Sequence, residues 1–96
     1  MIDKYINQII QGDCLEILKN IPYNSVDVTF ADPPFNLGKK YNGYRDHKEF
    51  HAYLDWCKRW IYEMVRVTKP TGSIFVHNIP KWLTYYANFL NEIAYF

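Results

Sequence analysis

Residues 26–36 read Val-Asp-Val-Thr-Phe-Ala-Asp-Pro-Pro-Phe-Asn, an apolar run that ends in an acid, two prolines and an aromatic ring. Val26, Val28 and Phe30 have the β-branched and aromatic side chains typical of a buried strand. Neither proline has an N–H to donate to a neighbouring strand, so the predicted strand stops at Asp32. A carboxylate and a ring therefore follow the carboxyl end of a strand, which is the edge where open α/β sheets bind ligands.

The residues before this stretch predict a strand and a helix. Residues 5–11 carry three isoleucines among polar residues and predict a first strand. Asp13 is a favourable N-cap for a short helix at residues 14–20, and Glu16 three positions later fits a capping box. A strand, a helix and a strand in this order normally give a parallel pair with a right-handed crossover.

The longest helix is predicted to begin at Asp46, with Glu49 as a second capping-box residue. Its apolar residues recur at helical spacing and are expected to face the core: Phe50, Tyr53, Leu54, Cys57, Trp60, Ile61, Met64 and Val65. Residues 69–72, Lys-Pro-Thr-Gly, are expected to end this helix and turn the chain. A third strand at residues 73–78 and a last helix that begins near Pro80 complete an α/β pattern.

Composition limits the classes of protein to consider. The chain has 96 residues, of which 49% are hydrophobic, so it holds one domain at most. Its net charge of +1 gives no global basic field, so any contact with DNA must be local. Cys14 and Cys57 have no metal-like spacing and are interpreted as reduced packing residues. The sequence lacks a signal peptide and a membrane-spanning run, and we expect a cytoplasmic protein.

Residues 36–46 are polar and aromatic, contain two glycines and show no apolar periodicity, so they predict a long loop. One interpretation is a solvated connector. The other is a DNA-binding arm, in which lysine and arginine contact phosphates and a tyrosine packs on a base. The arm is slightly favoured because the loop leaves the Asp32 site, and its candidate DNA-binding residues are Lys39, Lys40, Tyr41, Tyr44 and Arg45.

The three histidines do not predict a metal site. His47 and His51 are one helical turn apart but lack the following acid of the zinc-protease pattern, so they are interpreted as surface residues. His77 follows the third predicted strand and is a candidate to line a pocket at the same sheet edge as Asp32. Asn78 shares that position.

The Asp-Pro-Pro-Phe sequence at residues 32–35 resembles the catalytic motif of amino-group DNA methyltransferases, which is usually Asp-Pro-Pro-Tyr or -Phe for adenine N6 and Ser-Pro-Pro-Tyr for cytosine N4. Gly-Asp-Cys-Leu-Glu at residues 12–16 and Asn-Leu at residues 36–37 extend the resemblance to the class that places its catalytic motif before its cofactor motif. This resemblance implies a partial Rossmann-like, S-adenosylmethionine-dependent methyltransferase fold with parallel strands and intervening helices.

The resemblance also implies roles for particular residues. It assigns catalysis to Asp32, Pro33, Pro34 and Phe35. The Asp32 carboxylate and the Pro33 carbonyl would accept the two N–H bonds of the target amine, and Phe35 would stack on a flipped base. The cofactor would lie against Asp13, Cys14 and Asp32. Taken singly, Asp32 would be interpreted as a strand-end acid that caps a turn and Phe35 as a core aromatic residue, and the ordered motif favours the catalytic roles instead.

The glycine-rich cofactor motif of the family is missing, because the chain has only four glycines and none has that spacing. Residues 1–96 are therefore expected to be the amino-terminal catalytic part of a longer DNA methylase, without the target-recognition and cofactor-motif regions. The implied function is methylation of adenine N6 in double-stranded DNA, as in restriction-modification, with S-adenosylmethionine and without a metal.

Several alternatives stay open at this level. Cytosine-N4 methylation is the nearest rival, and methylation of RNA bases or of a protein glutamine is a weaker one, because Asp32 replaces the usual asparagine. A non-catalytic remnant that binds a partner is the alternative from another class. As an amino-terminal fragment, the chain is expected to expose sheet edges and apolar helix faces, and therefore to form a homodimer or to associate with a missing carboxy-terminal part.

Overall fold

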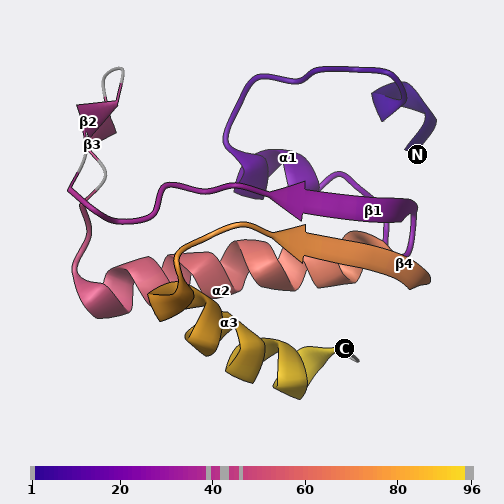
Figure 1. The fold of residues 1–96 in the computed structure, drawn as a ribbon. Coiled ribbons are helices and arrows are strands. Elements are labelled where there is room, and N and C mark those ends of the chain that lie inside the picture. Colours follow the sequence, from indigo (N-terminus) through magenta and orange to yellow (C-terminus); the bar gives the residue numbers. More distant parts are fainter. Residues whose placement is uncertain (1, 39, 42–43, 46, 95–96) are drawn as a thin grey trace.

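The structure, a computed structural model, describes residues 2–38, 40–41, 44–45 and 47–94. Figure 1 shows the elements in chain order: a 3-10 helix Ile2–Tyr5, α1 Cys14–Leu18, β1 Val26–Ala31, β2 Lys40–Tyr41, β3 Tyr44–Arg45, α2 Phe50–Val67, β4 Thr68–Val76 and α3 Pro80–Ile93.

The central sheet consists of β1 and β4, which pair in parallel. Phe30 lies opposite Phe75 and Ala31 opposite Val76, so the two strands end together. The connection between them passes through α2, which runs along the sheet (Figure 1). The predicted α/β class and the parallel pairing of these two strands are confirmed.

The predicted first strand at residues 5–11 is wrong. In the described structure the backbone turns after the 3-10 helix, with Asn7 at φ 59°, and then runs without regular structure to Gly12 (Figure 1). Ile6, Ile9 and Ile10 are exposed. A strand needs a hydrogen-bonded neighbour, and within the described sheet β1 pairs with β4 rather than with this segment. Local isoleucine content alone therefore does not make it a strand.

The prediction that residues 69–72 turn the chain is also wrong, since β4 starts directly at the end of α2. The turn-type residues instead form an irregular stretch within the strand: β1 advances from Val26 to Val28 while β4 advances from Thr68 to Ser73. Gly72 is required there, because a Cβ at this position would lie 2.5 Å from the Asp27 carbonyl oxygen. The strand ends at Val76, two residues before the predicted end.

The helix starts follow the predicted residues only in part. The Asp13 carboxylate caps α1 by accepting a hydrogen bond from the Leu15 N–H at 2.9 Å, but Glu16 pairs with Lys19 instead of closing a capping box. The long helix begins at Phe50 rather than at Asp46, which lies outside the described residues. Its N-cap is Glu49, which accepts from the His51 N–H at 2.7 Å.

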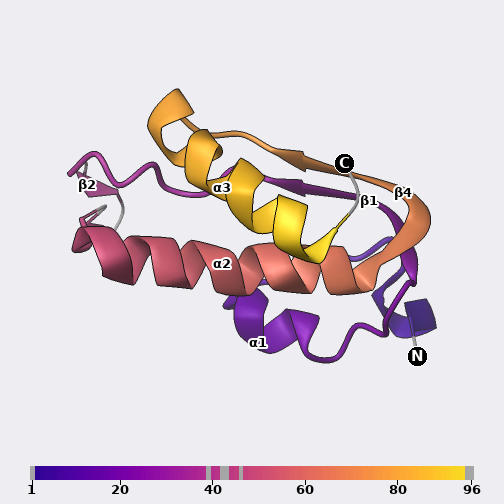
Figure 2. The same ribbon diagram turned by 90° about the horizontal axis from the view of Figure 1, so that it is seen from below.

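α2 and α3 cover one face of the sheet, as Figure 2 shows from below. The predicted apolar stripe of α2 is largely confirmed: Tyr53, Leu54, Cys57, Trp60, Ile61 and Met64 are buried, while Phe50 and Val65 are half-buried. Trp82 and Tyr86 of α3 join the same core. Pro80 stands in the first turn of α3, as predicted.

α1 docks on the carboxyl-terminal part of α2. Arg66 donates from Nη2 to the Leu18 carbonyl at 2.6 Å, and the same guanidinium pairs with Glu63 at 3.0 Å. A cation at the end of α1 satisfies one of the carbonyls that a helix terminus leaves without a partner. This contact fixes the loop that leads into β1.

Candidate functional site

The Asp-Pro-Pro-Phe segment leaves the carboxyl end of β1, as the sequence predicts. β4 ends beside it, and the His77 N–H donates to the Ala31 carbonyl at 2.9 Å. Because the strands are parallel, Asp32 and His77 emerge at the same edge of the sheet. The predicted position of His77 at the same sheet edge as Asp32 is therefore confirmed.

His77 connects the acid with the aromatic ring of this segment. Its Nδ1 lies 3.0 Å from Oδ1 of Asp32, and its ring meets Phe35 edge-on, with centroids 5.3 Å apart. The Asp32 side chain is 56% exposed, so the carboxylate is open to a ligand. The site thus presents a solvent-accessible acceptor whose orientation is set by an imidazole.

The three carbonyls that follow Asp32 differ in their partners. The Tyr53 hydroxyl donates to the Pro34 carbonyl, and Trp82 Nε1 donates to the Phe35 carbonyl at 2.8 Å. The described part of the chain provides no hydrogen-bond donor for the Pro33 carbonyl. The sequence predicts Tyr53 only as a packing residue and does not single out Trp82. Helical periodicity cannot distinguish a core aromatic residue that also makes a polar contact from one that only packs.

Asn36 anchors the chain just after the motif. Its carboxamide donates from Nδ2 to the Lys48 carbonyl at 3.0 Å and accepts from the Lys48 N–H at 2.6 Å, and its backbone has φ 60°. Asparagine tolerates this left-handed conformation better than most residues. The two hydrogen bonds tie the exit of the motif to the residues that precede α2.

Asn78 lies at the predicted edge, but its side chain is buried rather than lining a pocket. Its Nδ2 donates to the Tyr53 hydroxyl at 3.1 Å and to the Tyr86 hydroxyl at 3.0 Å. Tyr86 in turn donates to Sγ of Cys57 at 3.1 Å. Burial raises the pKa of Tyr53 to about 12 and also raises the pKa of Tyr86 and of Cys57, so all three groups stay protonated at neutral pH.

A cavity of about 500 Å³ opens beside Asp32, on the side of β1 away from β4. Apolar side chains, among them Ile17, Trp56, Trp60 and Met64, form its walls, while Cys14, Asp32 and Pro33 border it as well. Its volume lies in the range of about 300–1,000 Å³ that is usual for small-molecule sites.

Of the predicted cofactor residues, Cys14 and Asp32 border this cavity and Asp13 does not. Cys14 borders this cavity and is exposed, so its interpretation as a packing residue is wrong, whereas Cys57 is buried as predicted. Asp13 does not line the cavity, because its carboxylate caps α1. Its predicted cofactor role stays untested.

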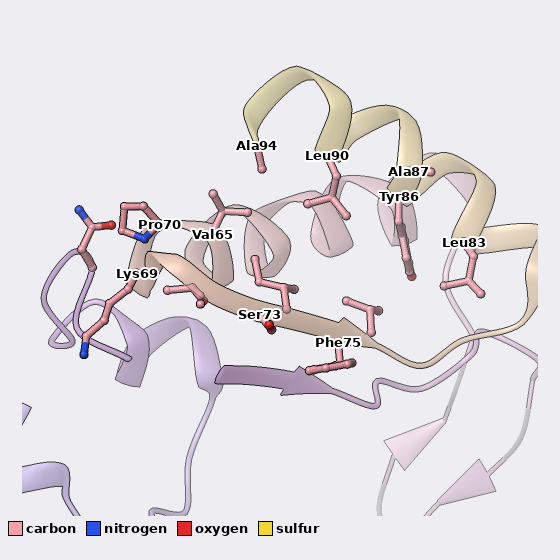
Figure 3. A pocket seen from close by; sticks show the side chains of 15 residues that line it. Val65, Lys69, Pro70, Ser73, Phe75, Leu83, Tyr86, Ala87, Leu90 and Ala94 are labelled. Atoms are coloured by element: carbon pink, nitrogen blue, oxygen red, sulfur yellow. The ribbon is translucent and has the colours of Figure 1, made fainter. Parts of the chain in front are cut away.

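A larger cavity of about 790 Å³ lies between β4, the end of α2 and α3 (Figure 3). Lys69 and Phe75 from β4 and Leu83, Tyr86 and Leu90 from α3 border it. It contains none of the predicted site residues.

The loop at residues 36–46 contains a short antiparallel hairpin formed by β2 and β3, which the sequence analysis did not predict. Asn42-Gly43 is the dipeptide typical of such a turn and was the available signal. Lys39 and the side chains of Lys40, Tyr41, Tyr44 and Arg45 lie outside the described part of the chain. Their predicted contact with DNA therefore stays a prediction.

Within residues 2–38, 40–41, 44–45 and 47–94, no group of three or more His, Cys, Asp or Glu residues could hold a metal ion. None of the helices described here has both the length and the apolar character needed to cross a bilayer. His47 and His51 are exposed, as predicted.

Comparison with known proteins identifies relatives of the chain. The sequence model of the family described as DNA methylase matches residues 26–95. Type II methyltransferase M.BamHI of Bacillus amyloliquefaciens is 52% identical over 88 residues, which cover 91% of this chain and 21% of the relative. Type II methyltransferase M.HpaI of Haemophilus parainfluenzae is 35% identical over 85 residues, covering 88% of this chain and 27% of the relative.

A third relative carries a more specific name. DNA adenine methyltransferase YhdJ of Escherichia coli is 44% identical over 70 residues, covering 73% of this chain and 24% of YhdJ. The chain spans about a quarter of the length of the curated relatives it matches.

Proposed function

We propose a function for this chain from its family, since the chain belongs to the DNA methylase family. Residues 1–96 act as the amino-terminal catalytic part of a DNA methyltransferase that methylates adenine N6. The name of YhdJ supports adenine as the target, and the names of the Type II methyltransferases support a place in restriction-modification. A cytoplasmic location follows from this role, because the DNA substrate lies there.

The observation that carries this proposal is a pair of hydrogen-bond acceptors just after the end of β1. The exocyclic amine of adenine is a poor nucleophile, because its lone pair is delocalised into the ring. Two acceptors placed around the amine favour the tetrahedral form with a localised lone pair. The exposed carboxylate of Asp32 and the Pro33 carbonyl, to which none of the described residues donates, are neighbours in sequence and offer such a pair.

Phe35 completes the proposed amine site. Its ring is half-buried and is held at its edge by His77, so it presents a surface to a flipped base at small entropic cost. Pro34 contributes by stiffening the segment, because its ring fixes φ.

The cavity beside Asp32 fits S-adenosylmethionine. Aromatic walls suit an adenine ring, and a carboxylate suits a cationic sulfonium, so Trp56, Cys14 and Asp32 are the residues proposed to hold it. When bound, this cofactor supplies the methyl group. Asp32 would then border both the cofactor and the amine, which is what direct transfer between them requires.

The test uses a chimera of M.BamHI in which this chain replaces the matched segment. We expect Asp32→Ala in the chimera to lower kcat by about 100-fold or more, as loss of one preorganised hydrogen-bonding group does elsewhere. Asp27→Ala is the matched control, because Asp27 is also an exposed acid with one ion-pair partner, Lys69, but lies at the other end of β1. Its kcat should stay near that of the unsubstituted chimera.

The product decides between the alternatives. Mass spectrometry of digested DNA separates N6-methyladenine from the rival N4-methylcytosine. Near-normal turnover by folded Asp32→Ala would remove the catalytic assignment. A folded chimera that transfers no methyl group, under conditions where M.BamHI does, would favour the non-catalytic remnant.

A further inference from the structure

We propose that Tyr53 and Trp82 are positioning residues of the Asp-Pro-Pro-Phe segment, which hold the Pro34 and Phe35 carbonyls and leave the Pro33 carbonyl free for the target amine. This inference rests on the proposed function for the role of Pro33. That two buried donors hold the segment follows from the hydrogen bonds of Tyr53 and Trp82, whatever the function of the chain.

The segment needs donors from elsewhere in the fold. Pro33 and Pro34 have no N–H, so neither can donate the ladder or turn hydrogen bonds that usually fix a loop. Between the Asp32–His77 contact and the Asn36–Lys48 hydrogen bonds, the segment is therefore held through its carbonyls. Tyr53 and Trp82 bind two consecutive ones, which determines the direction in which the preceding carbonyl, that of Pro33, is presented.

The two donors come from different helices and are rigidly placed. Tyr53 belongs to α2 and is 1% exposed, and Trp82 belongs to α3 and is 2% exposed. Their rings pack on each other with centroids 4.6 Å apart. The segment is therefore held by the contact between α2 and α3, so a change in that contact would move it.

The Tyr53 hydroxyl is itself oriented. It accepts from Asn78 Nδ2 at 3.1 Å, which leaves its own hydrogen directed toward the Pro34 carbonyl. Burial raises the pKa of Tyr53, so the hydroxyl keeps its proton, and remains a donor, to higher pH than an exposed tyrosine does. Asn78 directly follows His77. The two residues after β4 therefore orient both the Asp32 carboxylate, through His77, and the Tyr53 hydroxyl, through Asn78.

Tyr86 provides a matched control within the same hydrogen-bond network. It is 2% exposed and shares Asn78 with Tyr53. Its hydroxyl donates to Cys57 at 3.1 Å, lies at the longer distance of 3.5 Å from the Tyr53 hydroxyl, and makes no hydrogen bond to the segment. Tyr53→Phe and Tyr86→Phe each remove one buried hydroxyl and keep the ring. A purely structural role of Tyr53 predicts the same outcome for both variants.

The first measurement is the hydrogen exchange of the Trp82 indole N–H by NMR in this chain. That proton is donated to the Phe35 carbonyl, so its exchange rate reports directly whether the segment stays bound to Trp82. Trp60 Nε1 is buried without a partner in the described structure, so its exchange reports general opening of the core. We expect Tyr53→Phe to raise Trp82 exchange about fivefold relative to Trp60, in line with the loss of one hydrogen bond. Tyr86→Phe should leave the ratio unchanged.

The second measurement is methyl transfer by the chimera. We expect Tyr53→Phe and Trp82→Phe to lower kcat by about tenfold or more with little change in the KM for S-adenosylmethionine, because the acceptor for the amine is displaced. Tyr86→Phe should change neither constant.

Equal effects of Tyr53→Phe and Tyr86→Phe on the exchange ratio and on kcat would overturn the inference, as would an unchanged ratio in Tyr53→Phe. If the unsubstituted chimera transfers no methyl group, the proposed function fails, while the exchange ratio still decides whether Tyr53 holds the segment.

Discussion

The two faces of the β1–β4 sheet differ in burial, although alternate residues of the same two strands supply them. Ala31, Ile74 and Val76 pack against the core formed by α2 and α3. On the other face, Phe30 is 69% exposed and Phe75, directly opposite it, is 55% exposed. The residue types on both faces are those of a parallel sheet with two covered faces. The difference teaches that burial is decided by which elements pack on a face and not by its composition.

The largest effect is expected on the covered face. Ile61 is fully buried in the core, so Ile61→Ala should lower the free energy of unfolding by about 2–5 kcal/mol. Tyr62→Ala, the next residue of the same helix, is the control, since Tyr62 is exposed and should cost far less. Urea unfolding followed by circular dichroism measures both. Equal losses would show that this face is not the core.

An intermediate effect concerns the polar groups buried on the covered side. Tyr53 has a pKa of about 12 against a usual value near 10, so the neutral form is favoured by folding. The stability that this gives is complete below about pH 10 and is lost as the pH rises toward about 12. Tyr53→Phe should therefore lose less stability between pH 9 and pH 11 than the unsubstituted chain does.

Urea unfolding at both pH values tests this expectation. Tyr85→Phe is the control, because Tyr85 is exposed and its loss of a hydroxyl should leave the pH dependence unchanged. Parallel losses of stability in the Tyr53→Phe variant and in the unsubstituted chain would contradict it.

The smallest effect on unfolding is expected on the open face. Phe30→Thr keeps strand propensity and removes exposed apolar surface, so the free energy of unfolding should change by no more than about 0.5 kcal/mol. The same variant should reduce self-association, measured by sedimentation, because exposed aromatic patches favour it. A loss comparable with that of Ile61→Ala would mean that this face is covered in the chain in solution.

Much of the site was predictable, because it depends on a local break in the sequence. Two prolines must end β1, and parallel strands must finish at one edge, so Asp32 and His77 were placed correctly. The anchors of the segment were not predictable. Tyr53 and Trp82 look like ordinary core residues in a helical pattern, and their polar atoms reach Pro34 and Phe35 only because α2 and α3 meet there.

The wrong predictions for residues 5–11 and 69–72 share one cause. Residues 5–11 and residues 69–72 carry local signals, for a strand and for a turn, that the backbone does not follow. A strand depends on its neighbour, which residues 5–11 lack in the described sheet. Residues 69–72 are of turn type, but they form an irregular part of the strand that pairs with β1. Gly72 lies there close to the Asp27 carbonyl oxygen.

Periodicity and backbone chemistry in the sequence established the long amphipathic helix, the end of β1 before Asp32 and the Pro80 start of the last helix. These features follow from properties that each residue carries wherever it is placed: side-chain polarity, the fixed φ of proline and its missing N–H. Tertiary structure decided which face of the sheet is covered and which of three successive carbonyls remains free. Both depend on distances between segments far apart in the chain, such as 47 positions between Phe35 and Trp82, and only packing sets those distances.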